Sequence, residues 1–322
     1  MRGTILDLLR SRQGQFTSGE EIANQLGVSR TAIWKHIKEL KLAGYEIESY
    51  ARSGYQLVGT PDRLLPELVG HQLGTQFLGQ NIIHYDMVES TNEIAKKLAR
   101  QGAAHGTVVV SEEQSVGKGR MDRQFCCPQG GIWFSVILRP TILPQEAPKC
   151  TLLAAVAVAK AMAKFGLEAG IKWPNDILYQ GKKLTGILTE MSAEIDKINY
   201  VVIGTGINVN IPQEVFPAEI QDKAGSMLSI LGEPVDRLSF FQEVLRNLEE
   251  LYLKVMKEGF ADLLQQWRQY SITLGQEIEV IGLDERYTGR AKDIDIDGAL
   301  LVETATGIRK VLAGDVSIRP HK

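Results

Sequence analysis

The stretch SGEEIANQLGVSRTAIWKHIKELKL, residues 18–42, decides the fold of the N-terminal region. Ser18, with Glu21 three residues later, has the pattern of a capping box and predicts the start of a short helix. Gly27 supplies the left-handed turn that ends this helix. Ser29 then begins a second helix whose apolar residues recur at helical spacing. Two short helices joined by a glycine turn are typical of a helix-turn-helix.

The second helix is basic on its outer face, since residues 30–41 hold four Lys or Arg and one Glu. Residues 45–50 and 55–58 predict a hairpin, which corresponds to the wing of a winged helix. We therefore predict a DNA-binding winged helix-turn-helix, with its helix pair at about residues 19–38. The alternative is a small protein-interaction module with solvated cations. The candidate DNA-binding residues are Arg30, Thr31, Trp34, Lys35, Lys38 and Arg52.

The composition is that of a globular protein with two or three domains: 322 residues, 44% hydrophobic and 23% charged. The net charge of −3 excludes a generally basic nucleic-acid coat, so DNA binding must come from a local patch. Cys126, Cys127 and Cys150 have the spacing of neither a disulfide framework nor a zinc site. The sequence has neither a signal-peptide pattern nor an apolar run long enough to span a bilayer. We expect a cytoplasmic protein without membrane association.

Beyond the wing, strands alternate with longer helices and predict an α+β core with one mixed sheet covered by helices. Ser90 and Glu93 have the pattern of a second capping box. The predicted strands are 81–88, 107–111, 132–138, 176–179, 183–190 and 200–209, and the predicted helices are 90–102, 148–165 and 236–259. The predicted domains are 1–62, 63–270 and 271–322.

The segment QSVGKGRMDR, residues 114–123, is predicted to form a loop after a strand. Its glycines allow the backbone to approach a ligand closely. Lys118, Arg120 and Arg123 place three cations within six residues, as is needed to hold a carboxylate beside a triphosphate. The segment lacks the ending of a phosphate-binding P-loop. The alternative is an exposed basic loop.

Three further segments place polar groups beside apolar strands. Asn175 and Asp176, in KWPND, either form a turn or line a cleft. Lys183, in GKKLTGILTE, either extends to solvent or points at an anionic ligand. Asn208, in GTGINVN, follows glycines that either pack a strand end or approach a phosphate or a hydrated Mg²⁺.

Taken in order, the winged helix and the motifs STN, QSVGKGR, KWPND, KLTGILTE and GTGINV resemble the bifunctional biotin–protein ligase/biotin-operon repressor family. The resemblance covers essentially the whole chain. It implies a central mixed-sheet catalytic and dimerisation domain and an SH3-like C-terminal β-barrel. It also implies an enzyme that makes biotinyl-5′-AMP from biotin and ATP and transfers biotin to a lysine of a biotin carrier domain.

The resemblance implies that this carrier domain belongs to acetyl-CoA carboxylase or another biotin-dependent carboxylase. The resemblance further implies that the adenylate-bound homodimer represses biotin synthesis and transport operons by binding operator DNA. By the same resemblance we expect Mg²⁺ to enter with ATP near Asn208, with no metal fixed by the protein alone and no prosthetic group.

The resemblance assigns site residues by motif. The biotin-binding residues are Ser90, Thr91, Asn92, Gln114, Lys118, Gly119, Arg120 and Lys183. The nucleotide-binding residues are Arg120, Arg123, Phe125, Lys172, Asn175, Asp176 and Asn208. The catalytic residues are Lys183, Arg120 and Asp176, with Asp176 as the candidate base for the transfer step.

The sequence departs from the family pattern at three positions. Lys118 stands where arginine is commoner, Asp122 where glycine is usual, and Phe125 where tryptophan is frequent. Three rival hypotheses remain. The first is a ligand-sensing repressor without catalysis, the second a ligase whose head does not bind DNA, and the third a lipoate or octanoate ligase.

Overall fold

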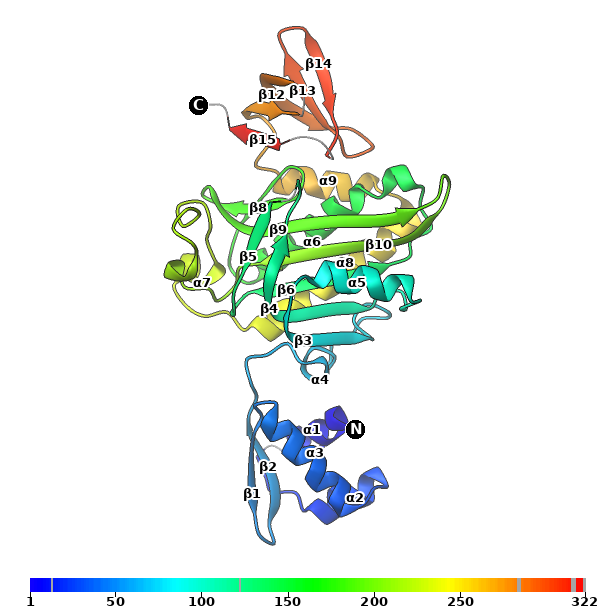
Figure 1. The fold of residues 1–322 in the computed structure, drawn as a ribbon, viewed down its shortest axis with the longest axis vertical. Helices are drawn as coiled ribbons and strands as arrows, with labels where there is room; N and C mark the ends of the chain where they lie inside the picture. The colour runs from blue at the N-terminus through cyan, green and yellow to red at the C-terminus, as the bar shows by residue number, and fades with distance from the viewer. Residues whose placement is uncertain (13, 122, 283–284, 314–316, 321–322) are drawn as a thin grey trace. The chain divides into compact units, whose positions relative to one another are not determined.

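The computed structural model divides the chain into two compact units, Met1–His71 and Gln72–Lys322 (Figure 1). The structure describes residues 1–12, 14–121, 123–282 and 285–313, and for residues 317–320 it describes the backbone alone. Asp122, one of the three departures from the family pattern, lies outside the described residues.

The N-terminal unit has the predicted winged helix-turn-helix arrangement. Ser18 Oγ accepts a hydrogen bond from the Glu21 amide at 3.0 Å, and Ser29 Oγ accepts one from the Ala32 amide at 3.2 Å. Gly27 ends the first helix of the pair with φ of 66°. The elements are α1 (Arg2–Ser11), α2 (Gly19–Leu26), α3 (Arg30–Leu42), β1 (Glu46–Tyr50), β2 (Gly54–Gly59) and α4 (Pro66–Val69).

This unit extends past residue 62, where the sequence predicts a domain boundary. Glu67 lies 4.0 Å from Arg2, and His71 lies 2.8 Å from Asp7, so the segment after the wing is tied to α1. Leu64 in the same segment is fully buried. Arg63 also donates to the Ala43 carbonyl at 3.4 Å, so the start of this segment contacts the helical unit as well.

A mixed eight-stranded sheet forms the centre of the second unit, as predicted. The strands are β3 (Ile82–Val88), β4 (Val108–Lys118), β5 (Gln124–Cys127), β6 (Ile132–Leu138), β7 (Gly170–Lys172), β8 (Asp176–Tyr179), β9 (Lys182–Ala193) and β10 (Ile198–Ile207). Their order is β3-β4-β6-β10-β9-β8-β7, with β5 paired to β4. Only the β3–β4 pair among these ladders is parallel.

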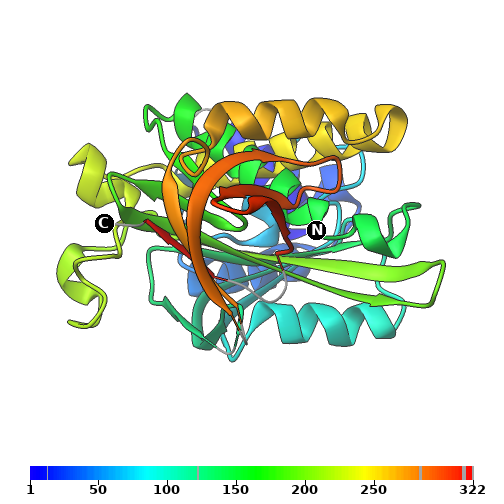
Figure 2. The same cartoon turned by 90° about the horizontal axis from the view of Figure 1, so that it is seen from above.

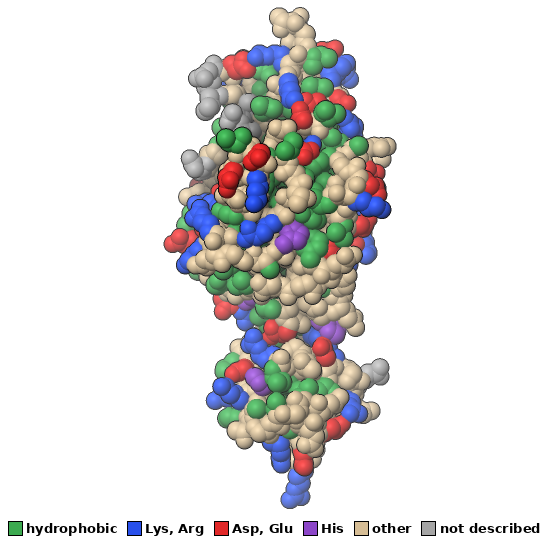
Figure 3. Space-filling view, turned by 90° about the vertical axis from the view of Figure 1, so that its right-hand side faces the viewer, with side chains coloured by type: hydrophobic (Ala, Val, Ile, Leu, Met, Phe, Trp, Pro, Cys, Tyr) green, Lys and Arg blue, Asp and Glu red, His purple; other side chains and the backbone are tan. Residues whose placement is uncertain are grey.

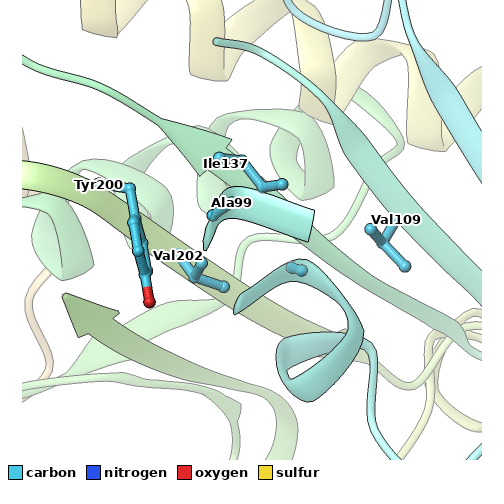
Figure 4. Packing of buried hydrophobic residues seen from close by; sticks show 6 residues of the cluster. Ala99, Val109, Ile137, Tyr200 and Val202 are labelled. Atoms are coloured by element: carbon cyan, nitrogen blue, oxygen red, sulfur yellow. The ribbon is translucent and has the colours of Figure 1, made fainter. Parts of the chain in front are cut away.

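Helices cover both faces of this sheet, with α5 on one face and α6 and α8 on the other (Figure 2). Ala99 of α5 packs with Val109, Ile137, Tyr200 and Val202 of the strands (Figure 4). The helices are α5 (Thr91–Arg100), α6 (Lys149–Lys164), α7 (Met227–Leu231), α8 (Arg237–Glu258) and α9 (Ala261–Tyr270), with 3-10 turns η1 (Pro144–Glu146) and η2 (Gln213–Val215).

The C-terminal part of this unit is the predicted small β-domain. It is a curved, antiparallel, five-stranded sheet of order β14-β13-β12-β11-β15 (Figure 2). Arg268 of α9 donates to Asp293 at 2.6 Å and so ties this sheet to the helices. Within the described residues, no helix combines the length and apolar character needed to cross a membrane. The strands are β11 (Glu277–Ile281), β12 (Arg286–Ile294), β13 (Leu300–Thr304), β14 (Gly307–Val311) and β15 (Ser317–Pro320).

Candidate functional site

One cavity of about 230 Å³ collects most of the predicted site residues. It is bordered by the start of α5, β4, β5, the segment 172–176, the start of β9 and the end of β10. The predicted residues on its wall are Ser90, Thr91, Asn92, Gln114, Lys118, Gly119, Arg120, Arg123, Phe125, Lys172, Asn175, Asp176 and Lys183. The lining residues that sequence reasoning missed are Met121, Gln124, Cys127, Trp173, Pro174, Gly186, Ile187, Leu188, Gly204, Thr205 and Gly206.

One wall of the cavity is a hydrogen-bonded polar network at the start of α5. The Thr91 amide donates to Gln114 Oε1 at 2.7 Å. Buried Ser135 donates to Asn92 Oδ1 at 2.6 Å, while Asn92 Nδ2 donates to Glu190 at 2.9 Å. Side chains fixed by each other in this way can present donors and acceptors to a neutral polar ring without rearranging.

The predicted capping box at Ser90 and Glu93 is wrong. Ser90 is the N-cap residue of α5 but makes no side-chain cap. Glu93 instead accepts hydrogen bonds from Lys96 at 2.9 Å and Lys118 at 2.6 Å. Hydrogen bonds between two charged groups are stronger than the amide contact that a capping box offers, so the carboxylate turns away from the helix start.

The basic segment is shorter as a loop than the sequence predicts. β4 continues to Lys118, and β5 pairs back onto it through Gly117–Phe125 and Lys118–Gln124. A Cβ at Gly117 would lie 2.2 Å from the Phe125 carbonyl oxygen, so this close pairing requires glycine. The basic turn therefore connects two paired strands, β4 and β5.

Each of three cavity cations contacts an oxygen of the protein. Lys183 Nζ lies 2.6 Å from Asp176 Oδ1. Arg120 donates to Asn175 Oδ1 at 3.1 Å and also to a backbone carbonyl, that of Ala313. Lys118 is the third, through the ion pair with Glu93 described above. Cations from two separate segments, the β4–β5 turn and the start of β9, thus line one cavity, as an anionic ligand requires.

Glycines let an aromatic ring lie against the sheet inside the cavity. Cβ atoms at Gly186 and Gly206 would lie 2.8 and 3.0 Å from the Phe125 ring. Lys183 Nζ is 5.3 Å from the centroid of that ring, and Trp133 meets it edge-on at 5.9 Å. The strand-end glycines of GTGINVN were the sequence signal for Gly206, but the same pattern fits ordinary strand packing. Gly186 lies within β9 and had no such signal.

Trp173 connects the cavity wall to the C-terminal β-domain. Its amide donates to Thr273 Oγ1 at 2.9 Å, and its indole Nε1 donates to the Gly298 carbonyl at 3.1 Å. The Trp173–Pro174 peptide bond is cis. Residues of the small β-domain therefore help to place Asn175 and Asp176.

Asn208 is the predicted site residue that the structure does not bring to the cavity wall. It is buried and donates to the Gly225 carbonyl at 2.9 Å. Among the described residues, no group of three His, Cys, Asp or Glu side chains is arranged to hold a metal ion.

Cys127 is a buried thiol on the cavity wall. Cys127 Sγ accepts from Gln114 Nε2 at 3.1 Å and packs beside Trp133 and Phe216. Burial raises the pKa of this thiol to about 12, so it stays protonated near neutral pH. Its contact instead orients the Gln114 amide.

The N-terminal unit carries a second hollow, between α3 and the β1–β2 turn. Arg30, Thr31, Trp34 and Arg52 line it. Trp34 is 57% exposed, and Lys38 Nζ lies 5.6 Å from its ring centroid. Lys and Arg side chains project from this unit at the bottom of Figure 3. The six predicted DNA-contacting residues are all exposed.

Three regions of the chain match models of known protein families. Residues 2–56 match the HTH domain, residues 85–208 the biotin/lipoate A/B protein ligase family, and residues 273–319 the biotin protein ligase C-terminal domain. The bifunctional ligase/repressor BirA of Bacillus spizizenii is 42% identical over 320 residues, which are 99% of this chain and 98% of that protein. The chain belongs to the BirA family.

Other BirA relatives have lower sequence identity to this chain. The Escherichia coli bifunctional ligase/repressor BirA is 29% identical over 313 residues, covering 95% of this chain and 94% of that protein. Among solved structures, the biotin protein ligase from Aquifex aeolicus in complex with biotin and ATP has a TM-score of 0.66 and 29% identity. That match covers 75% of this chain and all of the other.

Proposed function

We propose that this BirA-family chain is an AMP-forming biotin–protein ligase that also represses transcription. The observation that carries the proposal is the meeting of five sequence segments at one cavity: the start of α5, the β4–β5 hairpin, residues 172–176, the start of β9 and the end of β10. The structural relative from Aquifex aeolicus, whose complex contains biotin and ATP, supports a site for both substrates. The functional domains in this proposal keep the boundaries that the sequence predicts, 1–62, 63–270 and 271–322, although residues 63–71 belong to the N-terminal compact unit.

The proposed reaction has two steps. The biotin carboxylate attacks the α-phosphorus of ATP, which forms biotinyl-5′-AMP and releases pyrophosphate. The amine of a carrier lysine then attacks the acyl carbon of this mixed anhydride, which forms an amide and releases AMP. The carrier is a biotin carrier domain of acetyl-CoA carboxylase or another biotin-dependent carboxylase. Neither step needs a covalent bond to the protein.

In this proposal the polar wall binds biotin. Thr91, Asn92 and Gln114 present the donors and acceptors that a ureido ring needs, and buried Ser90 completes the wall. Gly119 allows the backbone of the basic turn to approach the ligand. Lys118, Arg120 and Lys183 face the carboxylate and the α-phosphate, where negative charge develops in the first step.

The nucleotide occupies the side of the cavity formed by Arg123, Phe125, Lys172, Asn175 and Asp176. Mg²⁺ accompanies ATP as a phosphate-bound ion and neutralises phosphate charge. Asn208 Nδ2 donates a hydrogen bond to the Lys183 carbonyl at 3.3 Å and so helps to position the start of β9.

Asp176 is the proposed base for the transfer step. A free lysine has a pKa of about 10.4, so the attacking amine must lose a proton. Asp176 lies on the cavity wall, paired with Lys183 at 2.6 Å. Movement of Lys183 toward the phosphate would leave the carboxylate to accept this proton.

Mass spectrometry of the protein after incubation with Mg²⁺-ATP and equal amounts of biotin, lipoate and octanoate tests the ligase proposal. We expect selective capture of biotinyl-AMP. Capture of lipoyl- or octanoyl-AMP would reject the biotin assignment. Bound biotin without any adenylate would move the chain to the class of ligand-sensing repressors.

For the N-terminal unit we propose operator DNA binding by a homodimer that the adenylate favours. Replacing Lys35 and Lys38 by Met removes two cations of α3 from each subunit, four per dimer, so we expect weaker binding and a salt dependence shallower by about 3.6 units of slope, roughly 0.9 per phosphate contact. Binding to a biotin-operon operator, measured across KCl concentrations with and without biotin plus ATP, checks this. An unchanged slope would remove these lysines from the interface. Lys41, which donates to Ser49 at 2.8 Å, is the matched control.

A further inference from the structure

Glu93 is a charged residue at the cavity edge to which the proposed reaction gives no role. It lies in the first turn of α5, and its Oε1 atom is 2.6 Å from Lys118 Nζ. Lys118 lines the cavity, whereas Glu93 is not among the lining residues. The carboxylate therefore holds a cavity cation from outside the ligand space.

The ion pair between Glu93 and Lys118 can be broken at low cost in free energy. Both side chains are partly exposed, 47% for Lys118 and 42% for Glu93, and exposed ion pairs contribute little to stability. Glu93 Oε1 also lies 2.9 Å from Lys96 Nζ, which in turn lies 2.7 Å from Glu190. Glu93 therefore keeps a cationic partner after Lys118 moves, and no unpaired charge results.

The electrostatic environment of Glu93 agrees with this arrangement. The hydrogen bond from Lys118, followed by that from Lys96, holds the pKa of Glu93 below its usual value. The carboxylate is thus ionised near neutral pH and attracts Lys118 under the conditions in which the site works.

We propose that Glu93 competes with the phosphate of the bound acyl-adenylate for Lys118, and so sets how fast the site releases this anionic intermediate. This inference rests on the proposed adenylate chemistry. Glu93 acts through Lys118 as a positioning residue and does not itself touch the ligand. Lys118 has one compact charge that exchanges partners readily, whereas an arginine at this position holds a planar paired contact.

The test measures dissociation of synthetic biotinyl-AMP from the full-length protein and from Glu93→Gln. Glutamine keeps the size of the side chain and removes its charge. We expect the variant to release biotinyl-AMP about two- to fivefold more slowly, the upper part of the range for one exposed ion pair. Glu89→Gln, at an exposed carboxylate two residues before α5, is the matched control and should match the wild type.

Two further measurements separate competition for Lys118 from a structural effect. Binding of biotinamide, which has no negative charge, should be the same in the wild type and Glu93→Gln. In a Lys118→Met background, adding Glu93→Gln should have no further effect on release of biotinyl-AMP. Release from Glu93→Gln that is unchanged or faster, or slowing that persists without Lys118, would overturn the inference. Failure of the wild type to bind biotinyl-AMP would instead contradict the proposed function.

Discussion

Replacing Lys183 by methionine is expected to lower the rate of adenylate formation by about 10²–10³-fold. Such a loss is typical when one group that stabilises developing charge is removed. Lys183 Nζ lies on the cavity wall 2.6 Å from Asp176, so the variant also leaves this carboxylate without its partner, where it repels the phosphates. Pyrophosphate release from biotin and Mg²⁺-ATP, followed under single-turnover conditions, measures the effect.

Lys182→Met is the matched control, because Lys182 is the preceding residue of β9 and does not line the cavity. It should retain a rate close to that of the wild type. Lys183→Arg should give an intermediate rate, since it keeps the charge but not the compact shape. A Lys183→Met rate within threefold of the wild type would exclude Lys183 from charge stabilisation.

Replacing Glu112 by alanine is expected to lower the free energy of unfolding of the second unit by about 3–5 kcal/mol, the range for breaking a buried ion pair from one side. Glu112 accepts from Arg237 at 3.0 Å and lies 2.9 Å from His84. The side chain of Arg237 is only 3% exposed, so its charge would remain buried after the substitution. Urea unfolding followed by circular dichroism measures the change.

Glu113→Ala, one residue further along β4, provides the control and should have a much smaller effect, because Glu113 is partly exposed. The double variant Glu112→Ala with Arg237→Met should recover part of the lost stability, since it also removes the buried positive charge of Arg237. Equal losses in the two single alanine variants would show that the ion pair itself contributes little.

Elements with strong local signals were predicted almost residue by residue. The predicted strand 132–138 is β6, and the predicted helix 148–165 is α6, Lys149–Lys164. α8 begins after Asp236, whose carboxylate accepts from the Leu238 amide at 3.1 Å. Apolar runs and caps are encoded within a few neighbouring residues, so a single sequence is sufficient to reveal them.

Features that depend on distant partners were not predictable in the same way. The end of β4 is polar and contains Gly117, which locally indicates a loop, and only pairing with β5 makes it a strand. Glu93 has the spacing of a capping residue, but Lys118 lies within 2.6 Å only in the folded chain. Most candidate site residues came from the family motifs. Trp173 also lies in one of them, KWPND, but its contacts with Thr273 and Gly298 exist only in the folded chain.

The four tryptophans differ in exposure, so their intrinsic fluorescence can report on the N-terminal unit. Trp133, Trp173 and Trp267 are at most 1% exposed, whereas Trp34 on α3 is 57% exposed. Acrylamide should therefore quench the emission of Trp34 preferentially, with the three shielded indoles as an internal standard. Binding of DNA at α3 can then be followed by the fluorescence of the unlabelled protein, separately from ligand binding in the cavity.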